Sequence, residues 1–203
     1  MKIGNSIKKH VSDNRWQYLS IFIIFLIGMI LGNYWVINLE GGVKDHLLGL
    51  INDYLRGGLE GTLDGKHIFL SAFLYQARSV FAIWFLGLTV IGLPLILAVV
   101  FLRGFALGFT IGFLFQEKAG AGIMITAMSI LPQNIVYIPF LIIWAVIAIN
   151  FSVFIVKGKK SELFSLGGAL IGYSIWMLIF MLIFLAGAFI EAYLSPFFLS
   201  LIL

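Results

Sequence analysis

Residues 103–139 read RGFALGFTIGFLFQEKAGAGIMITAMSILPQNIVYIP, one cation followed by two short apolar segments. The polar residues 116–118 separate the two segments, and the stretch closes on Pro132, Gln133, Asn134 and Pro139. As a helix, residues 104–116 rise roughly 20 Å, whereas the hydrocarbon core of a bilayer is roughly 30 Å thick. Neither apolar segment is comfortably long enough to cross a membrane as an ordinary helix.

The whole chain has the composition of an integral membrane protein. It has 203 residues, of which 62% are hydrophobic and 11% are charged, whereas soluble domains carry roughly 25% charged residues. Several runs of about 20 apolar residues follow one another, which is typical of transmembrane helices. The net charge of +4 is small, so we expect no nucleic-acid partner. The absence of cysteine excludes disulfides and thiolate metal sites.

These runs predict an all-α polytopic protein with about five transmembrane helices in a single integral membrane domain, residues 1–203. The expected spans are 18–37, 79–102, 104–116, 135–156 and 163–190. The first run has a basic flank but no small-residue cleavage site, which favours a retained signal anchor over a cleaved signal peptide. Residues 1–17 would then be cytoplasmic, 38–78 an extracytoplasmic amphipathic region, and 79–203 a helical bundle.

The boundaries of the second span depend on Pro94. We expect Pro94 to kink one span whose outer edge is Arg78 and whose inner edge is Arg103, where the side chain of Arg103 can reach the headgroups. The alternative is a break at Pro94, which would place Arg103 in the middle of the membrane at a substantial energetic cost.

The basic clusters predict the topology of the chain. Lys8, Lys9 and Arg15 precede the first span, and a second cluster at 157–160 follows the fourth. If both clusters are cytoplasmic, an even number of crossings separates them. Residues 119–134 would then be a re-entrant or half-buried segment on the outside. The N-terminus would be cytoplasmic and the C-terminus extracytoplasmic, in a multi-pass protein of the bacterial cytoplasmic membrane.

Residues 43–56 have the pattern of an amphipathic helix outside the membrane. One interpretation is a helix lying on the membrane surface, in contact with lipid. The other is a docking face for an extracytoplasmic partner, and the two are compatible. The apolar positions of this face are Val43, Leu47, Leu50, Ile51, Tyr54 and Leu55.

Glycines four residues apart recur in three of the expected spans. Small residues at this spacing let helix backbones approach closely in lipid. We expect them to pack helices within this chain, with a seam in a homodimer or hetero-oligomer as the alternative. The helix-packing candidates are Gly28, Gly32, Gly104, Gly108, Gly112, Gly168 and Gly172.

The sequence offers no catalytic, cofactor-binding or metal-ligating set. The three histidines lie in the first third of the chain, without metal-ligand spacing and far from the late serines. The late glutamates, Glu117, Glu162 and Glu191, fall at expected interfaces. We therefore expect a protein that is not an enzyme. Gln133 and Asn134 should lie at the headgroups, bond the ends of broken helices or line a small wet cavity, and Asn150 should bond another helix.

The chain resembles the stage II sporulation protein M family, over most of its length and in its five-span layout. A broader group of related membrane proteins often has histidine and glycine after the proline at 132, and Gln133 and Asn134 instead favour the sporulation branch. The family-motif residues are Gly92, Pro94, Arg103, Gly104, the run GFTIGFL at 108–114, Pro132, Gln133, Asn134, Pro139, Glu191 and Pro196.

The resemblance implies a role in engulfment of the forespore by the mother cell. It implies a membrane anchor without hydrolytic activity for a peptidoglycan-degrading complex with stage II sporulation proteins P and D. The location would be the sporulation septum or the mother-cell membrane. The alternative function is a small membrane channel or transporter with a site around residues 104–134.

Overall fold

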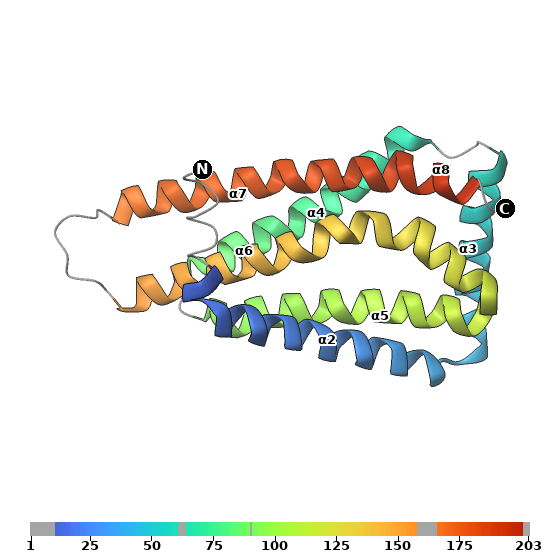
Figure 1. Ribbon diagram of the computed structural model, residues 1–203, viewed down its shortest axis with the longest axis horizontal. Helices are drawn as coiled ribbons and strands as arrows, with labels where there is room; N and C mark the ends of the chain where they lie inside the picture. The colour runs from blue at the N-terminus through green and yellow to red at the C-terminus, as the bar shows by residue number, and fades with distance from the viewer. Residues whose placement is uncertain (1–10, 61–63, 90, 158–165, 201–203) are drawn as a thin grey trace.

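The computed structural model describes residues 11–60, 64–89, 91–157 and 166–200, and these residues form an all-helical bundle (Figure 1). Helix α3 (Gly41–Glu60) lies across one end of the bundle, here called the α3 end. The elements, with two π-helical segments labelled η, are α2 (Arg15–Ile37), α3, α4 (Gly65–Gly87), α5 (Gly92–Ile125), η1 (Thr126–Ile130), α6 (Leu131–Lys157), α7 (Leu166–Phe189), η2 (Ile190–Leu194) and α8 (Ser195–Ser200).

Among the described residues, five segments are long and apolar enough to cross a membrane. They are Arg15–Ile37, Gly65–Gly87, Gly92–Lys118, Gly120–Lys157 and Gly167–Phe198. The predicted all-α architecture with five spans is thus confirmed. Arg15 and Lys157, which belong to the two basic clusters, lie at the end of the bundle opposite α3 (Figure 1).

The expected second span at 79–102 is wrong, because the chain breaks before Pro94. The second span is α4, residues 65–87, so Arg78 lies within a span and residues 64–78 do not form an outer amphipathic region. Pro94 occupies the first turn of α5, where backbone N–H groups have no partner within the helix and proline costs little. At Gly92 a Cβ would collide with the Leu86 carbonyl oxygen, so glycine permits the tight turn between the helices.

The expected re-entrant segment at 119–134 is also wrong. The chain reverses near Ala119 at the α3 end, and residues from Gly120 onward form the first part of the fourth span. Glycine at 122 permits this reversal, because a Cβ there would collide with the Leu114 carbonyl oxygen. Four spans still separate Arg15 from Lys157, so the crossing number inferred from the basic clusters is unchanged.

Helices α2 and α5 pack against each other through glycines on both partners. A Cβ at Gly28 or Gly32 would collide with backbone oxygens of Phe101 or Phe105. Conversely, Gly104 and Gly108 lie against the backbone of Phe25 and Met29, and Gly112 lies against Asn33. The remaining two candidates lie elsewhere: Gly168 is exposed near the start of α7, and a Cβ at Gly172 would meet nothing within 4 Å.

The second half of the core is an aromatic cluster between α4, α6 and α7. The fully buried Trp144 ring stacks on Tyr173 at 5.2 Å between ring centroids and lies 5.0 Å from Phe180. Its indole N–H donates to the Val80 carbonyl oxygen of α4 at 3.1 Å. Asn150 of α6 donates to the side chain of Asn14, the N-cap residue of α2, at 3.0 Å, so the predicted bond of Asn150 reaches the start of another helix.

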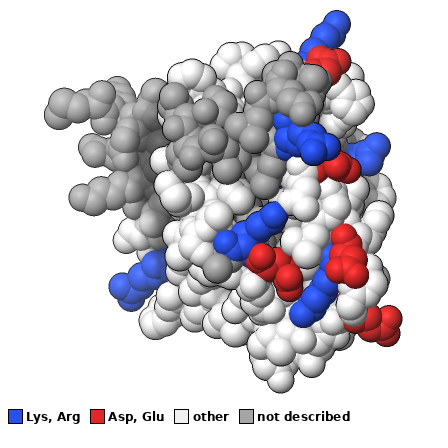
Figure 2. Space-filling model, turned by 90° about the vertical axis from the view of Figure 1, so that its right-hand side faces the viewer, with Lys and Arg blue, Asp and Glu red and all other residues white. Residues whose placement is uncertain are grey.

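Helix α3 is fixed to the bundle by polar and apolar contacts. Lys118 donates to Asn52 at 2.6 Å, and Lys44 Nζ lies 3.7 Å from Glu117 Oε1. Ile51 and Tyr54 pack on a small cluster around Leu114 and Ile125. Burial raises the pKa of Tyr54 above its ordinary value of 10.0. Figure 2 shows acidic and basic side chains interspersed on this end of the molecule.

The predicted docking face is therefore only partly free. Ile51 and Tyr54 are committed to the bundle, and Leu47 is half-buried. Val43 and Leu50 remain exposed, at 45% and 54% of their surface. The Leu55 side chain lies outside the described part of the structure.

Candidate functional site

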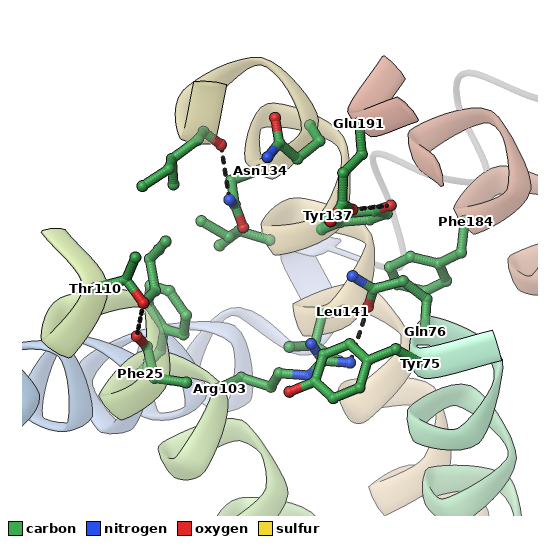
Figure 3. Close-up of a pocket in the computed structure, with 15 residues that line it drawn as sticks. Phe25, Tyr75, Gln76, Arg103, Thr110, Asn134, Tyr137, Leu141, Phe184 and Glu191 are labelled. Carbon is green, nitrogen blue, oxygen red and sulfur yellow. Dashed lines mark hydrogen bonds between the residues drawn. The ribbon is translucent and has the colours of Figure 1, made fainter. Parts of the chain in front are cut away.

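A cavity of about 250 Å³ lies inside the bundle between α4, α5 and α6 (Figure 3). Apolar side chains such as Phe25, Leu141 and Phe184 form part of its wall. Its polar lining consists of Tyr75, Gln76, Arg103, Thr110, Gln133, Asn134, Tyr137 and Glu191. A cavity with two opposite charges is unusual within a transmembrane bundle, where ionisable residues generally mark functional sites.

Arg103 reaches this cavity from α5 and not the inner membrane interface where we expected it. It lies roughly 16 Å along α5 from Gly92, near the middle of the third span. Its Nη2 donates to Gln76 Oε1 at 2.8 Å and to Ser79 Oγ, both on α4. The guanidinium also lies over the Tyr75 ring, 4.4 Å from its centroid, in a cation–π contact. Because α4 is a span, it can supply these partners at membrane depth.

Glu191 contributes the opposite charge from η2, whereas the sequence had placed it at an interface. The Tyr137 hydroxyl of α6 donates to Glu191 Oε2 at 2.9 Å. Glu191 and Arg103 also interact electrostatically. No ion pair within 4.0 Å joins these two groups among the described residues, so the two charged groups are not in direct contact.

Both π-helical segments adjoin the cavity and have the same relation to a proline. η1 is followed by Leu131 and Pro132, and η2 is followed by Ser195 and Pro196. Proline lacks an N–H and clashes with the carbonyl of the preceding turn, and a widened π turn relieves this conflict. Such π-bulges occur frequently at functional sites.

Gln133 and Asn134 bond a broken helix and line the cavity, which are two of the three roles expected for them. Gln133 Nε2 donates to the Ser129 carbonyl oxygen at 2.6 Å, and Asn134 Nδ2 donates to the Ile130 carbonyl oxygen at 2.8 Å. Both acceptors belong to η1, so the amides bond a broken helix as well as lining the cavity. Ser195, at the end of η2, donates to Gln133 Oε1 at 2.9 Å. This bond ties the two π segments together.

The structure thus gathers five family-motif residues around one cavity, namely Arg103, Thr110 of the run 108–114, Gln133, Asn134 and Glu191. Gly92 and Pro94 lie at the far turn, Gly104 lies in the α2–α5 seam and Pro139 lies on the exposed side of α6. Three polar residues of the lining, Tyr75, Gln76 and Tyr137, were not predicted from the sequence. An available signal was the amide of Gln76 inside the apolar stretch 68–83.

The family model of stage II sporulation protein M matches residues 21–196. The chain belongs to the stage II sporulation protein M family. It is therefore a sporulation membrane protein, as the resemblance implied. The matched range includes every residue that lines the cavity. No curated protein and no solved structure matches the chain significantly.

Proposed function

We propose that this protein is a non-enzymatic membrane scaffold that anchors and localises a peptidoglycan-hydrolase complex for septal thinning and forespore engulfment. Family membership supports a sporulation role. The proposed partners, by the family resemblance, are stage II sporulation proteins P and D. The proposed location is the septum or the mother-cell membrane.

The observation that carries this proposal is the fixed position of α3 across one end of the bundle. The Lys118–Asn52 hydrogen bond and the Lys44–Glu117 ion pair hold it, together with the packing of the half-buried Ile51 against the bundle. A helix already held in place loses little conformational entropy when a partner binds to it. Its exposed surface combines the apolar residues Val43 and Leu50 with charged neighbours.

The proposed orientation places α3 outside the cytoplasm, where peptidoglycan lies. Arg15 and Lys157 are at the opposite end of the bundle, and basic residues favour the cytoplasmic side. The surface suited to binding a hydrolase would then face the cell wall.

A pull-down in detergent with P and D tests the scaffold role. The full-length protein should retain one or both partners, and replacement of Val43 and Leu50 by serine should lower the retained amount by about tenfold. His67→Gln is the matched control, an exposed substitution on a neighbouring element, and should retain the partners normally. Failure of the unaltered protein to bind either partner contradicts the proposal.

Solute transport is the second candidate function, and the charged cavity inside the bundle is the observation that favours it. Binding sites of transporters lie near the bilayer midplane beside interrupted helices, and η1 interrupts the fourth span. Flux into proteoliposomes that Asn134→Leu abolishes would support transport. Absence of flux for candidate solutes, together with partner retention, would leave the scaffold as the function.

A further inference from the structure

The charged side chains of the cavity have hydrogen-bonding atoms that form no hydrogen bond to a described residue. Both hydrogen bonds that Arg103 makes to described residues come from Nη2, so Nη1 and Nε have no such partner there. Glu191 accepts the Tyr137 hydroxyl through Oε2, and no described residue donates to Oε1. Figure 3 shows Arg103 and Glu191 approaching the cavity from different helical elements.

The charge of the cavity lining restricts what can bind. Arg103 and Glu191 are the charged residues of the lining and their formal charges cancel. A ligand with net charge would leave an unbalanced charge inside the bundle, which is unfavourable at low dielectric constant. A molecule with no charged group would leave both side chains without a charged partner. A net-neutral ligand with an anionic and a cationic end gives Arg103 and Glu191 a charged partner each and adds no net charge.

We infer that the cavity binds a small zwitterion, with its anionic group at Arg103 and its ammonium group at Glu191. The planar guanidinium suits a carboxylate or a phosphodiester, since either accepts two parallel hydrogen bonds. The Tyr137 hydroxyl holds the Glu191 carboxylate in position to receive the ammonium group. This binding activity is separate from the scaffold role, and a test of one does not decide the other.

The size and the rim of the cavity fit such a ligand. A volume of about 250 Å³ equals roughly eight water molecules at their share of liquid volume. Tyr75, which covers the Arg103 guanidinium, is itself 55% exposed and forms part of the rim. A zwitterion could therefore enter either as a free solute or as the headgroup of a lipid beside the bundle.

Calorimetric titration of the full-length protein, in nanodiscs of phosphatidylglycerol alone, tests the inference. The probes are two free zwitterions, glycerophosphoethanolamine and β-alanine. The controls carry one charge each: glycerophosphoglycerol has only the anionic group, and ethanolamine has only the ammonium group. At least one zwitterion should bind about tenfold more tightly than either singly charged probe, since a singly charged probe lacks one of the two charged hydrogen-bonding groups.

A second experiment asks whether the zwitterion is a lipid headgroup, and it uses nanodiscs that contain phosphatidylethanolamine. If this lipid occupies the cavity, it should abolish binding of the free zwitterion.

Two variants assign the binding to these residues. Glu191→Gln keeps an acceptor for Tyr137 but leaves the cavity positive, so its preference should shift to glycerophosphoglycerol. Arg103→Gln leaves the cavity negative and should shift the preference to ethanolamine. Gly172→Ala changes a residue outside the cavity lining, where the added Cβ meets nothing within 4 Å, and should leave the preference unchanged.

The unaltered protein alone is sufficient to overturn the inference, even where a variant fails to fold. Equal affinity for zwitterions and single charges overturns it, as does absence of binding to all four probes in the absence of phosphatidylethanolamine. Zwitterion binding that both folded variants retain unchanged also overturns it, because the ligand would then lie elsewhere.

Discussion

At Gly108 the α2 and α5 backbones approach so closely that a Cβ would collide with the Met29 carbonyl oxygen. This obstacle is backbone, which cannot move aside as a flexible side chain can. Contacts of this kind drive helix association in lipid, where apolar burial between helices contributes little. The sequence could predict this use of Gly108, because spacing of small residues by four identifies a helix face.

We expect Gly108→Leu to destabilise the protein by about 2 kcal/mol, because the larger residue forces α2 and α5 apart. The measurement is reversible unfolding in mixed detergent. Gly172→Ala is the control, since its added Cβ meets nothing within 4 Å, and it should be neutral. Equal stability of the Gly108→Leu variant and the unaltered protein would contradict the role given to this seam.

Arg103 could not be placed from its own neighbours in the sequence. A cation after an apolar run normally indicates the edge of a span, and nothing in 92–114 reveals its partners. Those partners, Gln76 and Ser79, lie on another helix that the sequence analysis had given different boundaries. The position of the guanidinium therefore depends on tertiary contacts that become predictable only once α4 is correctly placed.

At the scale of elements, a side-chain hydrogen bond joins the two helices, α6 and α8, that directly follow the two π segments. Ser195 donates to Gln133, and Gln133 in turn donates to the Ser129 carbonyl oxygen. Both Ser195 and Gln133 are buried. The chain of bonds links η2 to η1 and thereby fixes the wall of the cavity that carries Glu191.

Ser195→Ala should destabilise the protein by about 1–3 kcal/mol, because it leaves the buried Gln133 Oε1 without a donor. Unfolding in mixed detergent gives the size of the loss, with Thr110→Val as the neutral control at an exposed hydroxyl. A double variant with Gln133→Leu should lose less than the sum of the two single losses, because the two residues are coupled. Strict additivity would show that the bond contributes nothing.

Some helix boundaries could be predicted from the sequence and others could not. Length and hydropathy predicted α2 and the amphipathic α3 well, since each is bounded by clear polar residues. They failed around Pro94 and around Gly120, where the chain turns within an apolar stretch of few polar residues. In both places a glycine permits a turn through close backbone approach, at Gly92 and at Gly122, and hydropathy does not register such contacts.

At the scale of the whole molecule, the turn between α4 and α5 provides a test of the proposed orientation of the chain in the membrane. The chain has no cysteine, so single cysteines can be introduced without background. Ile91 lies in this turn and is 70% exposed. Under the single kinked span that we first expected, position 91 would have been inside the membrane.

We expect Ile91→Cys and Lys157→Cys to react with a membrane-impermeant maleimide only after the cells are opened. Leu50→Cys should react in intact cells, because α3 lies at the other end of the bundle. Labelling of position 91 together with position 50 would contradict the proposed orientation. Lack of reaction at position 91 in opened cells would contradict the turn itself.

The central claim is that α3 presents a docking surface for the hydrolase complex, and site-specific photo-cross-linking in sporulating cells tests it most directly. A benzophenone amino acid at Leu50 should form a covalent adduct with stage II sporulation protein P or D during engulfment. The same group at Trp176, which is exposed on the side of α7, should form none with them. Adducts of P or D at position 176, or their absence at position 50, would contradict the account.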